Sequence, residues 1–511
     1  MSITASESVE LKEKDILHSS RLGVFSSDAA EYTASIDIDV KLLSSVVAIN
    51  SAHVIMLAER KILDRKIAGQ ILNALKQIPN DFEMKAELED VHMNVEDYVI
   101  SKIGNDSGGM MNLGKSRNDQ VATAIRMALR EDLILLAKSI VKLEKSLLVQ
   151  SGKYSASVMP GYTHLQRGQP VTLGHHLLAH FDSLDRDFSR LVDCYLRTNL
   201  SPIGAGALSS TGFDIDRDRA AELLGFDSVL ENSLDAVSSR DFATEAIYLC
   251  TQTMTDLSRL AEEIILWTTR EFSFAEISDE FASTSSMMPQ KKNAIVPEIF
   301  RAKTSQVLGD LTAAMGLMKS LPLSYNLDLQ ELTRNLWSAM DKAIVSISIL
   351  SDVISELKFS VDNMMEAVKS DEFLFATELA DYLVEKHHLS FREAHNRVGK
   401  LVRHVASNNS GRGQITTASP KVLSEILGVT IPAEELKLIF DPKLALQRRS
   451  AVGSPNPRLV KEAVKKRRES ISKHEATINS LEDGISESRE LLSSAANSIE
   501  KLGKGTGSLG R

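Results

Sequence analysis

The sequence predicts an all-α protein with three helical domains, the central one a bundle of long helices. Two observations support this fold class. Apolar residues recur at steps of three, four and seven across residues 121–147, 247–267 and 341–359, which places them on one buried helix face. Alternation of apolar and polar residues, the pattern of half-buried strands, is scarce. Helices that exceed about 25 residues are typical of long bundles.

Segments rich in Gly, Asn, Ser and Pro divide the chain and set the predicted domains. These segments are residues 105–116, 408–420 and 451–457. The predicted domains are an N-terminal helical domain (1–114), a central long-helix bundle (115–363) and a C-terminal helical domain (364–511).

The composition is ordinary for a soluble globular protein, since 43% of the 511 residues are hydrophobic and 25% are charged. A net charge of −10 argues against nonspecific binding to nucleic acid or anionic membranes. Cys194 and Cys250 lie in apolar helical patterns, so we expect buried free thiols, with no disulfide framework and no zinc spacing. Residues 1–15 lack the apolar region of a signal peptide, and no apolar run approaches membrane-spanning length. We therefore expect a cytoplasmic protein.

The first of several polar segments, SRNDQ at residues 116–120, precedes a long helix. Asn118 or Asp119 would cap that helix. A cap does not explain Arg117, whose guanidinium suits two-point binding of a carboxylate. From these residues alone, a cap and a binding site are equally good interpretations.

The second polar segment, residues 159–172, brackets His164 between two prolines, and we predict a stiff polar loop. An isolated histidine is more often structural than catalytic. Imidazole is nevertheless the side chain best suited to proton transfer near neutral pH.

The third polar segment, residues 283–303, joins serines to Met287, Met288 and two lysines ahead of a helix expected over 293–307. Two methionines would make a poor exposed surface, so we predict a partly buried loop whose hydroxyls and cations bind an anion. Glu298, near the start of the helix, either complements the helix dipole or orients an imidazole from another segment.

Together with a weaker fourth segment, LSYNLDLQE at residues 323–331, these stretches resemble the fumarase/aspartase superfamily and, within it, argininosuccinate lyases. The superfamily signature G-S-S-x-M-P-x-K-x-N is matched by TSSMMPQKKN at residues 284–293. The argininosuccinate lyase branch is matched, in order over roughly residues 20–460, by SRNDQVAT, PGYTHLQRGQP, NSLDAVSSRDF, MMPQKKN, YNLDLQE and SFREAHNRVGKLV.

The resemblance implies an all-α homotetramer in which the long central helices form the core and segments of three subunits build each active site. The implied reaction is the reversible elimination of argininosuccinate to L-arginine and fumarate through an aci-carboxylate carbanion, with no cofactor and no metal. The implied catalytic residues are Ser285, His164, Glu298, Lys291 and Asn293. The implied substrate-binding residues are Ser27, Arg117, Asn118, Thr163, Tyr325 and Gln330.

The resemblance also implies a role for each catalytic residue. Ser285 is expected to take the proton next to the carboxylate, and His164, oriented by Glu298, to protonate the departing nitrogen. The reverse assignment stays open. Lys291 and Asn293 would stabilise the aci-carboxylate, because such a carbanion needs fixed cations and hydrogen-bond donors.

Two alternative functions stay open at this stage. One is another fumarate-producing lyase of the superfamily, such as adenylosuccinate lyase or aspartase. The other is a non-catalytic, crystallin-like structural homologue.

Three positions depart from the family's pattern. Thr284 replaces the glycine before the serine pair, and NLGKS at residues 112–116 replaces H-T-G-R-S. Thr333, followed by Arg334, replaces a lysine. Either a contact with a substrate carboxylate is missing, or Arg334 makes it.

Past the region of resemblance, the chain continues to Arg511 with a heptad pattern. The aliphatic residues at steps of seven are Val464, Ile471, Ile478, Ile485, Leu492 and Ile499. They predict a helix over about 457–502, bent or broken near Gly484, that packs along another helix of the assembly and stabilises the tetramer. The tail from Gly503 is expected to be disordered.

Overall fold

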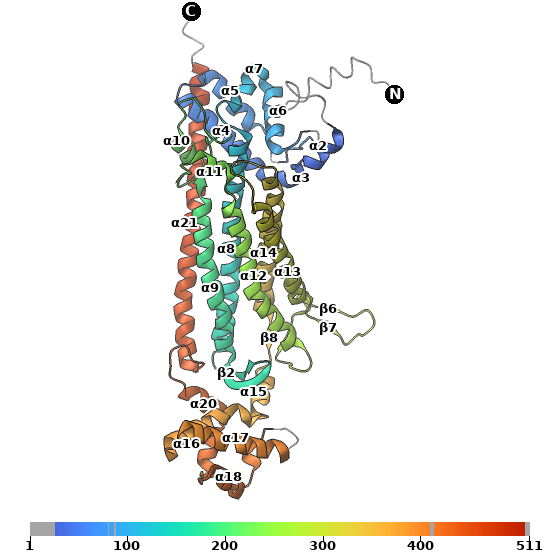
Figure 1. Ribbon diagram of the computed structural model, residues 1–511, viewed down its shortest axis with the longest axis vertical. Coiled ribbons are helices and arrows are strands. Elements are labelled where there is room, and N and C mark those ends of the chain that lie inside the picture. Colours follow the sequence, from blue (N-terminus) through green and yellow to red (C-terminus); the bar gives the residue numbers. More distant parts are fainter. Residues whose placement is uncertain (1–25, 80, 86–87, 409–412, 506–511) are drawn as a thin grey trace, which may run out of the picture.

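The computed structural model describes residues 26–79, 81–85, 88–408 and 413–505, and its fold is all-α, as predicted. Long helices run side by side, with short helices gathered at each end of the bundle (Figure 1). The part of the chain that the structure describes contains strands only as two-stranded pairs. The stretch LGVF at Leu22–Phe25, which resembles the family's G-G-R-F ahead of Ser27, lies outside the described residues.

The helices fall into three groups along the chain. At the N-terminal end of the bundle lie α2 (Ser27–Thr33), α3 (Ile36–Asp39), η1 (Val40–Leu42), α4 (Leu43–Glu59), α5 (Arg65–Lys76), α6 (Val91–Ile103), α7 (Asn105–Gly108) and η2 (Gly109–Asn112). The bundle contains α8 (Arg117–Lys153), α9 (Leu173–Thr198), α12 (Asp241–Thr268), α13 (Ile295–Met318), α14 (Asp328–Glu356) and α21 (Pro457–Gly505), with the short α10 (Arg217–Leu223), α11 (Ser233–Ser238) and η3 (Asp279–Phe281) in its connections. At the other end lie α15 (Val361–Lys369), η4 (Glu372–Phe375), α16 (Ala376–His387), α17 (Phe391–Asn408), η5 (Ile415–Thr417), α18 (Pro420–Leu427), α19 (Ala433–Ile439) and α20 (Pro442–Arg448).

The strands pair locally and tie the helix connections together. The antiparallel pairs are β1 (Val158–Thr163) with β2 (Gln166–Thr172), β5 (Ala275–Glu276) with β8 (Lys358–Phe359), and β6 (Ser283–Thr284) with β7 (Lys292–Asn293); β3 (Leu200–Ser201) pairs in parallel with β4 (Ser228–Val229). The helical pattern expected to run to Phe359 therefore ends at Glu356, because the next residues pair with β5.

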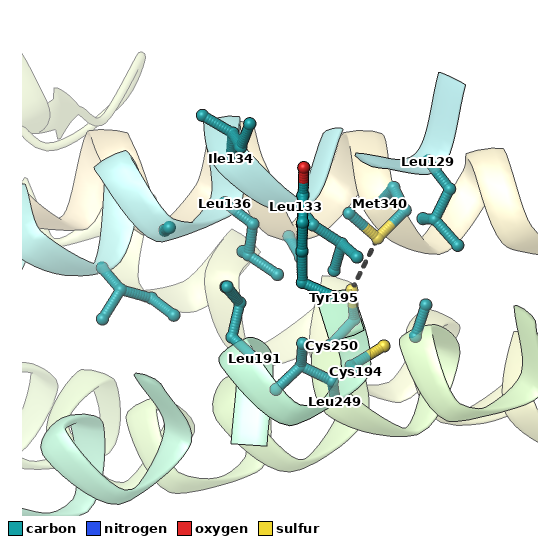
Figure 2. Packing of buried hydrophobic residues seen from close by; sticks show 14 of the residues in the cluster. Leu129, Leu133, Ile134, Leu136, Leu191, Cys194, Tyr195, Leu249, Cys250 and Met340 are labelled. Atoms are coloured by element: carbon teal, nitrogen blue, oxygen red, sulfur yellow. Dashed lines mark hydrogen bonds between the residues drawn. The ribbon is translucent and has the colours of Figure 1, made fainter. Parts of the chain in front are cut away.

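The bundle interior is a continuous apolar core to which four helices contribute in one region (Figure 2). Cys194 of α9 and Cys250 of α12 lie in it as buried free thiols, as expected, and the Cys250 Sγ is 3.4 Å from the Met340 Sδ of α14. Burial raises the pKa of the Cys194 thiol to about 12, so this thiol stays protonated and unreactive at neutral pH. A second, smaller core lies among helices α15 to α20.

One helical stretch has enough length and apolar character to cross a membrane. It covers residues 27–59, and 67% of its apolar window is buried inside the fold. The sequence pattern did not reveal it as an apolar run because Ser, Asn and His residues interrupt it. Buried residues of α4, such as Ile55 and Leu57, belong to the main core, so we interpret the stretch as a core helix.

Helix α21 is continuous through Gly484, so the predicted break is wrong. It runs the length of the bundle beside α8 and reaches α5 and α4 (Figure 1). Its heptad residues enter the main core, where Ile471 and Ile478 are 5% and 4% exposed. Their burial outweighs the roughly 1 kcal/mol that a helical glycine costs relative to alanine. The helix ends at Gly505, and the rest of the predicted tail lies outside the described residues.

Two polar residues of α21 that face the bundle, Arg467 and His474, have specific partners on other helices. Arg467 forms a two-point ion pair with Asp182 of α9. The Nδ1 of His474 is 3.0 Å from the Oε2 of Glu144 on α8, and its ring stacks on Phe188. These contacts fix the register of α21 against the bundle.

Ile478→Ala is expected to lower the free energy of unfolding by about 2–5 kcal/mol, because it leaves a cavity in a packed interface. The neighbouring Asn479 is exposed, so Asn479→Ala should change stability little. Denaturant titration of both variants tests this, and the turnover rate per folded site should stay close to that of the parent. An unchanged unfolding midpoint with a large loss of turnover would show that α21 serves the chemistry rather than stability.

Candidate active site

The residues singled out in the sequence lie at three separate places in one chain. Arg117 is the first residue of α8. His164 is in the β1–β2 hairpin, which follows the C-terminal end of α8. A helix of 37 residues is about 55 Å long, so these two residues lie at opposite ends of the bundle (Figure 1). Ser285 lies in the β6–β7 hairpin, which projects from the side of the bundle.

A cavity of about 270 Å³ at the N-terminal end of the bundle brings together Arg117, Tyr325 and Gln330. The Arg117 Nε is 3.2 Å from the Oδ2 of Asp90, and the Gln330 amide donates to the carbonyl of Thr33 at 2.7 Å. The wall carries guanidinium, phenol and amide groups together with the carboxyl groups of Asp39, Glu89 and Asp90. A carboxylate-bearing ligand would therefore have to replace the partners that Arg117 and Gln330 have in the single chain.

The start of α8 explains how Arg117 and Asn118 are presented. Ser116, rather than Asn118 or Asp119, is the N-cap, and it forms a capping box with Asp119. The prediction that Asn118 or Asp119 caps the helix is therefore wrong. Ser116 followed three positions later by an acidic residue is the pattern of a capping box. With the cap provided by Ser116, the Asn118 amide donates instead to the carbonyl of Ala207 at 3.1 Å.

Asp119 anchors the loop after β3 to the start of α8. It is fully buried, and its Oδ2 accepts hydrogen bonds from the backbone N–H groups of Gly204 at 3.1 Å and Gly206 at 2.8 Å. Burial raises its pKa to about 6, although these hydrogen bonds and the nearby Lys115 oppose the shift. This carboxylate thus holds together the segments that present Arg117 and Asn118.

The segment around His164 is a β-hairpin, not the loop that the sequence suggested. His164 and Leu165 form its two-residue turn with φ values of 54° and 56°, and Thr163 pairs with Gln166 beside them. Strand alternation is hidden in the sequence because Pro160 and Pro170 pair across the hairpin. Thr163 and His164 are exposed at its tip, and the described residues of this chain provide the His164 ring with no hydrogen-bond partner.

The β6–β7 hairpin presents Ser285 with two hydrogen-bond donors. Its Oγ accepts from the backbone N–H groups of Met287 at 3.2 Å and Met288 at 3.1 Å. The methionines are 85% and 41% exposed, so the partly buried loop that we expected is exposed in the single chain. In the part of the chain that the structure describes, the hairpin projects from the bundle and its tip is exposed (Figure 1).

The residues that follow Ser285 surround the base of the same hairpin. Lys291 is exposed next to β7, and the Asn293 amide lies 3.5 Å from the Ser283 Oγ. Glu298 is exposed in the first turn of α13, which begins at Ile295 rather than at the predicted residue 293. No contact among the described residues joins Glu298 to His164.

Three further positions singled out in the sequence have different surroundings. Ser27 is exposed on α2 and does not line the cavity. Thr333 does line the cavity, and its hydroxyl donates to the carbonyl of Leu329 at 3.2 Å. Arg334 forms an ion pair with Asp37 on α3, so its charge is already engaged in the single chain.

Arg240 is a candidate that the sequence analysis did not single out. Its guanidinium is fully buried and donates to the carbonyls of Val237 and Ser239, while its Nε and Nη2 have no hydrogen-bond partner in the described structure. Burial lowers its pKa to about 10, and the neighbouring Tyr325 opposes this shift. The residue lies within the quoted NSLDAVSSRDF motif, but no sequence pattern distinguishes a buried arginine there from an exposed one.

Comparison with known proteins places this arrangement in a family. A family model described as lyase matches residues 26–309, and one described as argininosuccinate lyase C-terminal matches residues 373–447. The argininosuccinate lyase of Methanococcoides burtonii is 41% identical over 471 residues, covering 91% of this chain and 95% of that protein. The chain belongs to the argininosuccinate lyase family. The argininosuccinate lyase of Methanocaldococcus jannaschii is similarly related, with 40% identity over 94% of this chain and 99% of its own.

Solved structures agree with membership of the argininosuccinate lyase family. EDDS lyase in complex with formate superposes with a TM-score of 0.84 at 27% identity, covering 92% of this chain and 94% of that chain. A class II fumarase from Schistosoma mansoni, at 17% identity and a TM-score of 0.67 over 79% of this chain and 90% of that chain, shares the fold.

Asp119→Asn is expected to destabilise the protein by about 1–3 kcal/mol, because an amide group would face a backbone N–H donor. Burial raises the folded-state pKa of Asp119 from its ordinary value to about 6, so folding favours its protonated form. Its contribution to stability therefore falls as pH rises from about 4 to about 6 and is constant above.

Unfolding free energies of the parent and Asp119→Asn between pH 4 and pH 8 test this assignment. The difference between the two should vary with pH below about 6 and be flat above it. Asp106→Asn, at an exposed position of α7, is the matched control. A difference that does not change with pH would contradict the raised pKa.

Proposed function

We propose that this chain catalyses the reversible elimination of argininosuccinate to L-arginine and fumarate, as a cytoplasmic homotetramer whose active sites are each shared by three subunits. The observation that supports a shared site is the separation along α8. Arg117 and His164 lie at opposite ends of a 37-residue helix, so one chain cannot bring them to one substrate. Antiparallel packing of central bundles would bring opposite ends together.

Ser285 is the proposed base that removes the proton next to the substrate carboxylate. A serine hydroxyl is a weak acid, so its anion needs stabilisation. The N–H groups of Met287 and Met288 already point at the Oγ and favour the charged form. Lys291 and Asn293 would hold the aci-carboxylate that develops when the proton leaves.

His164 is the proposed acid that protonates the departing guanidino nitrogen. Its exposure on a hairpin tip suits a group that serves a substrate held mainly by another subunit. Glu298, also exposed, would come from a different chain to orient and polarise the imidazole, as the third member of a proton-transfer set does in hydrolases.

The cavity at the N-terminal end of the bundle is the proposed anchor for the substrate. Arg117 would bind a carboxylate, with Tyr325 and Gln330 beside it. Asn118 and Ser27, together with Thr163 from the hairpin tip of another subunit, are proposed to complete the contacts. The exposed methionines of the β6–β7 hairpin would close over the substrate and exclude water, which strengthens the electrostatic interactions inside.

Ser285→Ala is expected to lower turnover by about 100-fold to 10,000-fold, the usual loss for a proton-transfer group, while substrate binding and assembly persist. Ser286→Ala is the matched control and should stay within a few-fold of the parent. Fumarate formed from argininosuccinate is measured by absorbance, with adenylosuccinate as the comparison substrate. Loss of activity in Ser286→Ala only would assign the base to the other hydroxyl, and turnover of adenylosuccinate only would overturn the substrate.

Mixing inactive His164→Asn and Ser285→Ala chains is expected to restore activity. If the two residues come from different subunits, about a quarter of the sites in randomly mixed tetramers carry neither substitution. Recovery is measured as fumarate release after subunit exchange, and exchange itself is verified with differently tagged chains. Complete exchange without recovered activity would show that both residues act from the same chain.

A further inference from the structure

Helices α9 and α12 of the bundle bring together three side chains of the kinds that bind metal ions. His176 and His180 are four residues apart on α9, so they lie on the same helix face. Both of their Nε2 atoms contact the same carboxylate oxygen of Glu263 on α12, at 2.7 Å and 2.9 Å. The proposed reaction uses none of these residues.

The donor set matches the chemistry of a borderline divalent cation. Zinc and similar ions bind imidazole nitrogen and carboxylate oxygen at about 2.0–2.2 Å, and two histidines at this helical spacing are a common half of such a site. The three ligand atoms lie within 4.8 Å of one another, so small side-chain rotations would bring all of them around one ion. A fourth position would remain for water.

The surroundings favour a cation at this point. Trp267 packs edge-on against the His176 ring at 5.2 Å between centroids and limits its rotation. Side-chain exposures of 27%, 11% and 32% for the two histidines and the glutamate leave a path for an ion.

A second cluster, Glu144, Asp185 and His474, is a weaker candidate. It has one imidazole, and its Glu144 carboxylate is fully buried. The His474 ring already joins α21 to α8 through this carboxylate, which accounts for its position.

We propose that His176, His180 and Glu263 form a binding site for a divalent transition-metal cation of the zinc class, which clamps α9 to α12. Helix α9 follows directly from β2 of the His164 hairpin, and α12 leads into the segment that carries the Ser285 hairpin. The ion would therefore fix the bases of the two segments that hold the proposed proton-transfer residues.

Cobalt binding to the full-length protein tests this proposal without any activity measurement. Co²⁺ bound by two imidazoles and a carboxylate gives visible absorption bands that Zn²⁺ abolishes by displacement. We expect one Co²⁺ per chain in the parent. Affinity should fall by at least about 10–100-fold in His176→Asn, in His180→Asn and in Glu263→Gln, since even outer partners of a metal site matter by that much.

His175→Asn, a substitution at the adjacent histidine of α9, is the matched control and should bind Co²⁺ like the parent. Zn²⁺ should raise the thermal midpoint of the parent and of this control, but not that of the three site variants. Circular dichroism verifies that each variant is folded. Because three site residues are substituted independently, the test remains valid if one of the variants does not fold. A parent protein that binds no Co²⁺, or folded site variants that bind it unchanged, would overturn the proposal, whatever the fate of the lyase assignment.

Discussion

The uninterrupted helix α8 is the constraint on which the rest of the structure depends. It contacts α9, α14, α21 and α4 along its length, and its start is fixed by the Ser116–Asp119 capping box. A rigid rod of this kind sets the distance between the cavity at one end and the His164 hairpin at the other. The separation of the candidate residues is thus built into this 37-residue helix, and the site shared between subunits that we propose would overcome it.

The sequence predicted most of the fold because packing dominates it. Long stripes of apolar residues at helical spacing predict long helices packed around an apolar core, and the structure confirms this prediction. Local details were harder to predict. The hairpin at residues 158–172 was missed because its prolines hide the alternation, and a break was expected at Gly484 because helix propensity was given too much weight against the burial of Ile478 and Ile485. Arg240 gave no signal, since burial of a charge depends on neighbours far away in the sequence.

The candidate site was predicted mainly through family motifs and less through physical patterns. Ser285 illustrates the difference. Its residue type does not indicate a base, and the motif alone singled it out; the structure then added the two N–H groups on its Oγ. The cavity joined Arg117 to Tyr325 and Gln330, which periodicity could not have shown. In the shared site that we propose, the meeting of segments from separate chains is not encoded in any local pattern.

The turn of the β1–β2 hairpin shows where this fold gives up stability. Two-residue turns with both φ values positive favour Asn and Gly, yet His164 and Leu165 occupy this one. For residues with a Cβ, left-handed backbone costs about 1–2 kcal/mol each. A glycine at either position would relax the backbone, and at residue 164 it would also remove the imidazole. With His164 as the acid that we propose, selection for thermal stability alone would tend to remove this group, so stability and the proposed activity place opposite demands on the turn.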